Sequence, residues 1–239
     1  MNTEEIFEKI EEYRTCELQS EETHWNNREI NIPVLNKKFK VNGFGVCENS
    51  KFEKGSYRYY LEFNIDNNKS NKSLTVLLMN PSDKTYPDKH IDNTIKNALR
   101  IGFVEKYSKV IILNSFAKIC GNGSEAETYY NNMTDNDKCI EDENKKFVEE
   151  ILKNAEDILF ACGGKVLEEL YQNYLTILKN SNKKIWSYAK DRTKDKNRPR
   201  HLSTQSPENR VRFNEFIKKP TKYELKIIDD NGVLSIKIV

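Results

Sequence analysis

Two asparagines stand directly after short apolar runs that look like buried strands. Asn80 follows LTVLLM (74–79), and Asn114 ends KVIILN (109–114). Each carboxamide offers both a hydrogen-bond donor and an acceptor, which suits it to read the edge of a nucleobase or to hold a water molecule. Asparagine is also a common turn residue, so each position alone has an ordinary structural interpretation. Two such positions facing one crevice favour a binding site.

A carboxamide is not basic, so a general base in this site has to be a carboxylate. Asp83, Asp88 and Asp92 follow Asn80 in the predicted loop and at the start of the next helix. Solvated surface acids are the alternative interpretation. We expect Asp83 and Asp92 to supply the carboxylate chemistry.

The segment 190–212 carries eight basic residues against three acidic ones, although the whole chain has a net charge of only +2. It ends at a predicted helix N-terminus, and both basic clusters and helix N-termini favour phosphate. Arg198, Arg200 and His201 lie inside this segment. A solvated basic loop is the alternative. Residues 1–30 carry nine acids and three bases, which favours a solvated helical face over an acidic interaction arm.

Apolar runs alternate with amphipathic segments from residue 74 onward, which predicts an α/β fold with a parallel sheet. We expect a three-layer sandwich around a central four-stranded parallel sheet. The predicted strands are 74–79, 109–114, 157–162 and 183–189, and the predicted helices are 91–103, 143–155, 165–180 and 207–219.

The two ends of the chain read differently from this α/β core, which we place at 55–219. Residues 1–54 begin with a helix from Thr3 to about Glu17, where Asn2 and Glu5 fit a capping box. Extended segments follow at 38–46 and 56–65, with Asn-Gly and Lys-Gly turn signals nearby. Residues 220–239 predict a hairpin around Asn231-Gly232 that pairs Ile227 with Ile236 and Leu225 with Ile238.

Ligands of open parallel sheets bind outside the carboxyl ends of the strands. This rule selects the segment 80–83, the pair Asn114-Ser115, the pair Gly163-Gly164 and the segment 197–203. Tyr57, Tyr59, Tyr60 and Tyr86 could stack on a base, although strand packing is the favoured role of the first three.

The composition excludes several classes of protein. The 239 residues are 37% hydrophobic and 32% charged, which is enough for a core inside a polar surface. No run of about 18 apolar residues occurs, as a membrane-spanning helix requires, and the N-terminus lacks the apolar core of a secretion signal. The five cysteines form no CxxC, and the three histidines stand at no metal-ligand spacing. Nothing in the local sequence supports a catalytic Cys–His pair. We therefore expect a cytoplasmic protein without a metal or cofactor.

The chain from about Gly55 to Phe216 resembles the DUF1643 family, a bacterial and phage family without an established function. The resemblance lies in YRYYLEF (57–63), LLMNPSDK (77–84), IDNTIKNALRIGF (91–103), VIILNSFA (110–117), EDENKKFVEEIL (141–152), LFACGG (159–164) and PRHLS (199–203). The chain departs from the family pattern at Ser115, where the family usually has Leu, and at Cys162-Gly163, where it usually has Trp-Gly. The distribution of this family suggests phage defence or counter-defence, which no residue here shows.

The same order of motifs is more distantly similar to the uracil-DNA glycosylase superfamily. That resemblance implies a DNA base N-glycosylase, with modified or damaged bases among its candidate substrates, which flips the base into a crevice and has DNA as its partner. Asn80 would hold the attacking water with Asp83 or Asp92, Asn114 would read the base, and His201 would stabilise the departing base. Other substrate contacts would come from Pro81, Ser82, Tyr86, Ser115, Gly163, Arg198, Arg200 and Ser203. The chain lacks the proline that follows the histidine in that superfamily, and it has Asn instead of Asp in the first slot, as in the mismatch-specific branch.

Two other functions stay open at the level of sequence. One is a non-catalytic module that binds nucleic acid or nucleotide, which the missing aspartate at position 80 favours. The other is an enzyme that acts on a free nucleotide or nucleoside.

Overall fold

A nine-stranded mixed sheet forms the centre of the computed structural model, which describes residues 1–15, 23–66, 68–86, 90–163, 168–190 and 198–239. The strands are β1 (His24–Ile32), β2 (Lys37–Cys47), β3 (Arg58–Ile65), β4 (Ser73–Leu78), β5 (Lys109–Asn114), β6 (Asp157–Phe160), β7 (Ile185–Ser187), β8 (Tyr223–Asp230) and β9 (Val233–Ile238). The described helices are α1 (Thr3–Thr15), α2 (Asn93–Val104), α3 (Gly123–Asn131), α4 (Asp135–Asn154), α5 (Glu168–Ser181) and α6 (Pro207–Lys218), with short 3₁₀ turns at Pro33–Leu35 and Glu48–Ser50.

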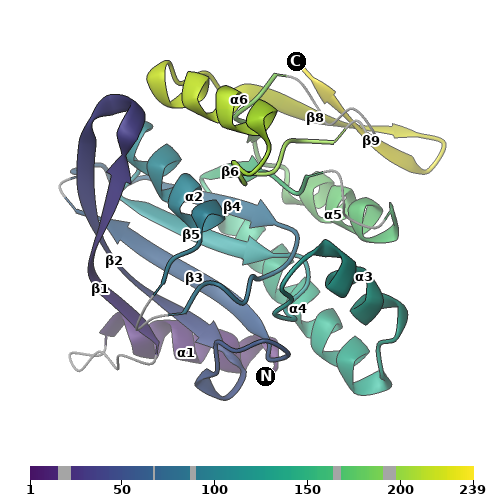
Figure 1. The fold of residues 1–239 in the computed structure, drawn as a ribbon. Coiled ribbons are helices and arrows are strands. Elements are labelled where there is room, and N and C mark those ends of the chain that lie inside the picture. The colour runs from purple at the N-terminus through teal and green to yellow at the C-terminus, as the bar shows by residue number, and fades with distance from the viewer. Residues whose placement is uncertain (16–22, 67, 87–89, 164–167, 191–197) are drawn as a thin grey trace.

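The strands lie in the order β1-β2-β3-β5-β4-β6-β7-β8-β9 (Figure 1). β5, β4, β6 and β7 pair in parallel, whereas every other pair is antiparallel. The prediction of a central sheet of four strands is therefore wrong. The four parallel strands are the middle of a sheet that continues through three strands on one side and two on the other.

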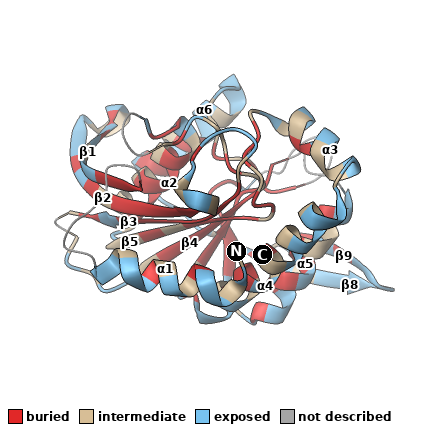
Figure 2. Ribbon diagram, turned by 90° about the horizontal axis from the view of Figure 1, so that it is seen from below, coloured by how far each residue is buried: buried red, intermediate tan, exposed pale blue. Residues whose placement is uncertain are grey.

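Helices cover both faces of this sheet, as Figure 2 shows with the sheet viewed along its edge. α1, α4 and α5 pack on one face, where their apolar side chains join Leu77 and Leu113 in one core cluster. α2 and α6 pack on the other face against Val76 and Ile112. Successive residues of β4 and β5 thus point into different cores, and this explains why both strands read as continuous apolar runs.

The predicted ends of several elements are confirmed by their hydrogen bonds. Asn2 and Glu5 exchange side-chain to backbone hydrogen bonds at the start of α1, and Ser206 caps α6. The hairpin of β8 and β9 pairs Ile227 with Ile236 and Leu225 with Ile238 as expected. The division at residues 54 and 220 stays a prediction, and the sheet continues across both points.

Other features were missed because they depend on how the strands pair. β1 is polar (HWNNREINI) and owes its conformation to β2. The Asn-Gly sequence at 42–43 lies inside β2 and makes no turn, because Gly43 provides the space that the Phe63 ring occupies. β8 extends the main sheet by pairing with β7. Within the described part of the chain, no helix is long and apolar enough to cross a membrane.

A buried carboxylate joins α1 to the sheet. Glu62 on β3 is 1% exposed and accepts hydrogen bonds from Arg14 Nη2 at 2.7 Å and from the Tyr60 hydroxyl at 2.6 Å. Lys109 Nζ on β5 lies 3.0 Å from its other oxygen. Burial opposes the charge of Glu62, but Arg14, Tyr60 and Lys109 outweigh it and lower the pKa of this carboxyl.

We expect Glu62→Gln to lower the free energy of unfolding by about 2 kcal/mol at pH 7, because two cations lose their buried partner. The lowered pKa makes this contribution present above pH 4.5 and lost as the pH falls through the folded-state pKa. Urea unfolding at pH 7 and pH 3.5 measures both effects. Glu29→Gln, which breaks an exposed pair with Lys38, is the control and should cost less than about 0.5 kcal/mol. Equal effects of the two variants would contradict the assignment.

Candidate functional site

The loop after β4 is fixed to the loop after β5. Asn80 Nδ2 donates to the Pro81 carbonyl at 3.0 Å and to the Cys120 carbonyl at 3.4 Å, and the Cys120 N–H donates to the Pro81 carbonyl at 3.0 Å. Both donors of the Asn80 amide therefore serve the backbone. Its Oδ1 accepts no hydrogen bond from the described residues, so this atom is the one available to a ligand.

Asp83 lies at the far end of the same loop. Its Oδ1 is buried and has no partner among the residues that the structure describes. Its Oδ2 lies 3.2 Å from the point where a Cβ on Gly121 would stand, so this loop packs on the residue that follows Cys120. The pKa of Lys54 is raised mainly by Glu125 and to a lesser degree by Asp83, which places a cation near this carboxylate.

A buried arginine of β3 donates hydrogen bonds to the loop after β4. Arg58 is 1% exposed, and its Nη1 donates to the carbonyls of Ser82 and Thr85, both at 3.3 Å. The Thr85 hydroxyl donates to Asp92 at 2.8 Å. These contacts link β3, the loop after β4 and the start of α2.

Asp92 is the N-cap of α2. Its Oδ1 accepts from the N–H groups of Thr94 and Ile95 at 2.7 and 3.0 Å, and its Oδ2 accepts from Thr85. The carboxylate is 7% exposed. Each oxygen therefore has a structural partner, and this arrangement suits a helix cap better than a proton acceptor.

Asn114 at the end of β5 is 1% exposed. Neither its Nδ2 nor its Oδ1 has a hydrogen-bond partner among the described residues. Its backbone is held by α4, because Asn144 Nδ2 donates to the carbonyls of Asn114 and Ser115 at 3.2 and 3.3 Å. The Ser115 hydroxyl donates to the carbonyls of Leu78 and Met79 at 3.1 and 2.8 Å, so it joins the ends of β4 and β5.

Glu141, one turn before Asn144 on α4, holds the next stretch of the chain. Its two oxygens accept from the N–H groups of Ala117 at 2.8 Å and Lys118 at 3.3 Å, and from the Tyr129 hydroxyl at 3.2 Å. Burial raises the pKa of Glu141 to about 7, although these hydrogen bonds oppose the shift. Sequence reasoning missed Arg58, Glu141 and Asn144. The signal for the last two was their spacing of three on one helix face.

His201 stands beside the end of β6. The Ser203 N–H donates to His201 Nδ1 at 3.0 Å, so the neutral ring carries its proton on Nε2. Burial lowers the pKa of His201, and the charge of Asp92 opposes this only in part. A neutral imidazole that donates from Nε2 is therefore the expected state at neutral pH.

Gly163 makes room for this histidine. It has a φ of +78°, and a Cβ at this position would stand 2.9 Å from the Cβ of His201. Its N–H donates to the Pro199 carbonyl at 3.1 Å. The segment around His201 is fixed from other sides by Asn97 Nδ2, which donates to the Leu202 carbonyl at 2.7 Å, and by the Tyr188 hydroxyl, which donates to the His201 carbonyl at 2.9 Å.

The two arginines next to His201 point into the protein. Arg198 is 1% exposed, and its guanidinium lies 2.6 Å from Glu168 and 4.3 Å from the centre of the Tyr171 ring. Arg200 is 7% exposed and contacts Asn209 at 2.9 Å and Glu208 at 3.4 Å. The residues 191–197 of the basic segment lie outside the described residues, as do Asp88 and Gly164.

The remaining predicted residues lie around this edge. Tyr86 and His90 exchange backbone hydrogen bonds, and the Ser82 hydroxyl accepts from the Lys84 N–H at 3.1 Å. Tyr59 and Tyr60 are fully buried in the core. A groove of about 520 Å³ opens between the turn before β3 and α3, with Cys120 in its lining. Cys120 connects this groove to the Asn80 loop through its backbone hydrogen bonds with Asn80 and Pro81.

A family model described as "Protein of unknown function (DUF1643)" matches residues 58–201. The chain belongs to the DUF1643 family. The match begins at Arg58 and ends at His201, so it contains the loop after β4, the ends of β5 and β6, and the supporting residues of α4. α1, β1, β2, α6, β8 and β9 lie outside it. Comparison with curated proteins gives no match.

Among the residues that the structure describes for this DUF1643 member, no three His, Cys, Asp or Glu side chains come together as a metal site would need.

Gly163→Ala should lower the free energy of unfolding by about 2 kcal/mol more than Gly232→Ala, because only Gly163 has a neighbour where its Cβ would stand. Both glycines have a positive φ, so the control contains the backbone strain without the contact. Thermal and urea unfolding of the two variants measure the difference. Equal losses would show that Gly163 does not pack on His201.

Between about pH 4.5 and pH 7, Glu141 should make the protein less stable as the pH rises, since the folded state holds its proton longer than the unfolded state. The full effect of this shift is about 3 kcal/mol. We expect the difference in unfolding free energy between wild type and Glu141→Gln to change by about 2.5 kcal/mol from pH 5 to pH 8, because a small part of the effect has already developed at pH 5. The exposed Glu127→Gln variant serves as control. A difference that does not depend on pH would contradict the raised pKa.

Proposed function

We propose that this DUF1643 protein binds a nucleobase of DNA at the carboxyl ends of β4, β5 and β6 and cleaves its N-glycosidic bond. Asn114 carries the proposal. Its side chain is 1% exposed and has both a donor and an acceptor without a partner among the described residues.

An unpaired polar group inside a protein costs about 1–3 kcal/mol. Asn114 has two such atoms at the carboxyl edge of the parallel strands, where ligands of this architecture bind. A nucleobase edge presents a donor and an acceptor side by side and would pair both atoms. Because Asn114 is nearly inaccessible, the base reaches it only when a covering segment moves. The base must also leave the DNA stack, as in base flipping.

His201 is suited to the leaving base. When the bond to the sugar breaks, its electron pair stays on the base, which becomes an anion. A neutral imidazole that donates from Nε2 stabilises such an anion by a hydrogen bond and does not need to transfer a proton. The hydrogen bond from Ser203 to Nδ1 and the lowered pKa of His201 support this state.

Asp83 is the better candidate for the carboxylate that assists the attacking water. Its Oδ1 is unpartnered within the described chain, whereas both oxygens of Asp92 serve as acceptors in the cap of α2. In the proposed step, a water held by Asn80 Oδ1 attacks the sugar C1′ and gives its proton to Asp83. The negative charge of Asp83 also favours the cationic sugar that precedes attack. Asp92 then acts as a positioning residue.

Arg198 and Arg200 take a different part in this proposal from the direct phosphate contacts that the sequence suggested. Their contacts with Glu168, Tyr171 and Asn209 favour a role in shaping the segment that carries His201. Arg198 and Arg200 are then positioning residues. The DNA backbone would instead contact other basic side chains of the segment 190–212.

Binding without catalysis is the second candidate. The observation that favours it is the Asn80 amide, whose two donors already hold the backbone and whose oxygen is not basic. A protein of this kind would bind nucleotide or nucleic acid with a steep dependence on salt and would release no base.

Mass spectrometry of bases released from genomic and phage DNA tests the proposal. We expect release by the wild type, and a loss of at least about 100-fold for Asn80→Ala, Asn114→Ala and Asp83→Asn, which corresponds to about 2.7 kcal/mol of transition-state stabilisation. Asn154→Ala, which changes an asparagine at the far end of α4, should retain full release.

Two results would contradict the proposal. One is the absence of any released base across the whole panel, and the other is full activity of Asn80→Ala. Salt-dependent DNA binding without release would favour the second candidate.

A further inference from the structure

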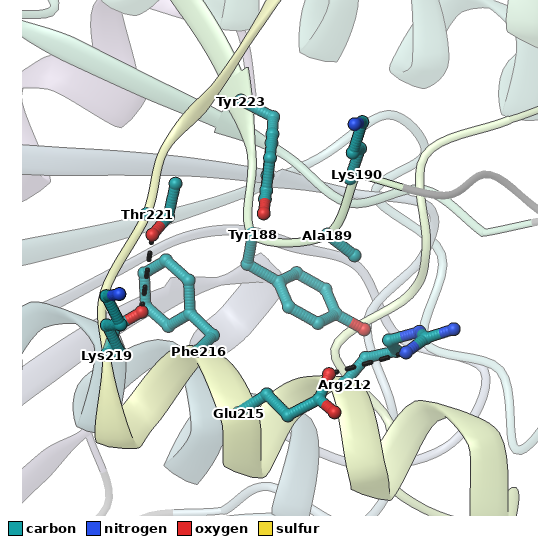
Figure 3. Close-up of a pocket in the computed structure, with 9 residues that line it drawn as sticks. All are labelled: Tyr188, Ala189, Lys190, Arg212, Glu215, Phe216, Lys219, Thr221 and Tyr223. Atoms are coloured by element: carbon teal, nitrogen blue, oxygen red, sulfur yellow. Dashed lines mark hydrogen bonds and ion pairs between the residues drawn. The ribbon is translucent and has the colours of Figure 1, made fainter.

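A second cavity lies at the carboxyl edge of the sheet, away from Asn80 and Asn114. It has a volume of about 760 Å³ and opens where β7 ends, between α6 and the start of β8 (Figure 3). Ser187 at the end of β7 pairs with Tyr223 at the start of β8. The three elements therefore enclose a space of the size that small ligands occupy.

Aromatic rings form the inner part of this cavity. Tyr188 and Phe216 are 2% and 3% exposed, with ring centres 6.3 Å apart and planes at 87°. Trp186 stacks behind Phe216 at 6.1 Å and fixes its ring. Tyr223 extends from the other wall toward Tyr188 in Figure 3. Tyr188 and Phe216 are thus nearly covered and form a packed apolar floor, whereas the half-buried Tyr223 is the ring that a flat apolar ligand can contact over its face.

Cations surround the mouth. Lys190, Arg212 and Lys219 are exposed and line the mouth of the cavity. Glu215 is the acidic residue among the described residues of the lining. Glu215 lies 3.4 Å from Arg212. Figure 3 shows Lys190 and Arg212 on one side of the cavity and Lys219 on the other. The positive charge favours an anion at the mouth.

We infer that this cavity binds a free nucleoside phosphate, with its base against Tyr223 above the floor formed by Tyr188 and Phe216, and its phosphate beside Arg212 and Lys219. An aromatic interior with cations at the rim matches the two parts of such a ligand. The enclosure by β7, α6 and β8 accommodates one nucleotide and favours a free nucleotide over a continuous strand.

The cavity also touches the segment of the proposed active site. Tyr188 lines it, and the Tyr188 hydroxyl donates to the carbonyl of His201 at 2.9 Å. A ligand that contacts the Tyr188 ring thus contacts the residue that holds the backbone of His201. The inference itself does not depend on base cleavage, because no cavity residue takes part in the bond-breaking step; Lys190 and Arg212 only belong to the basic segment that is proposed to contact the DNA backbone.

Isothermal titration calorimetry of the full chain with the four deoxynucleoside monophosphates tests the inference. At least one nucleotide should bind, and the affinity should fall about tenfold in both Lys219→Glu and Arg212→Glu. Lys38→Glu, which changes an exposed lysine on β2, should leave the affinity unchanged. These are surface positions, and thermal unfolding of each variant verifies that the fold is retained.

Two further binding measurements separate the contributions of the base and of the phosphate. Deoxynucleosides without phosphate and inorganic phosphate alone should each bind at least tenfold more weakly than the nucleotide, and Tyr223→Ala should weaken the nucleotide more than inorganic phosphate. The inference is overturned if no nucleotide binds, if Lys219→Glu binds like Lys38→Glu, or if only an oligonucleotide binds. Base release is measured separately, so a failure of glycosidic cleavage leaves this result intact.

Discussion

The buried guanidinium of Arg58 is the interaction on which the edge of the sheet depends. A charge with 1% exposure needs compensating hydrogen bonds, since uncompensated burial of an ion costs several kcal/mol, on the order of the stability of a whole domain. Here the carbonyls of Ser82 and Thr85 supply them. The loop after β4 can leave this position only by removing those oxygens from the charge. The position of Thr85, and with it the hydrogen bond from Thr85 to Asp92, follows from that restraint.

The sequence predicted the parallel part of the architecture because each of its strands is covered on both faces. That burial produces the apolar runs that end at Asn80 and Asn114, and the same runs revealed the edge where they meet. Arg58 and Glu141 were not predictable in this way. Arg58 reaches the edge only because β3 pairs antiparallel with β5, and Glu141 reaches it only because α4 packs along the end of β5. Both depend on pairings between distant segments, which hydrophobic periodicity does not encode.

The charged residues of the sequence predicted the site less well than its apolar runs did. Arg198 and Arg200 belong to a strongly basic stretch, yet both are nearly buried and face Glu168 and Glu208 from α5 and α6. A net charge counted along the chain contains no information about partners contributed by other elements. His201 shows the same limit, because its protonation is governed by burial and by the backbone of Ser203.

The hairpin of β8 and β9 has an evolutionary consequence. It lies beyond the matched family segment, which ends at His201, and it attaches to the sheet through β7 alone. The cavity beside it takes Tyr188, Ala189 and Lys190 from within the family segment and the rest of its wall from α6, β8 and the turn between them. A lineage that gains or loses β8 and β9 would therefore change the wall of this cavity without altering a residue of the edge formed by β4, β5 and β6.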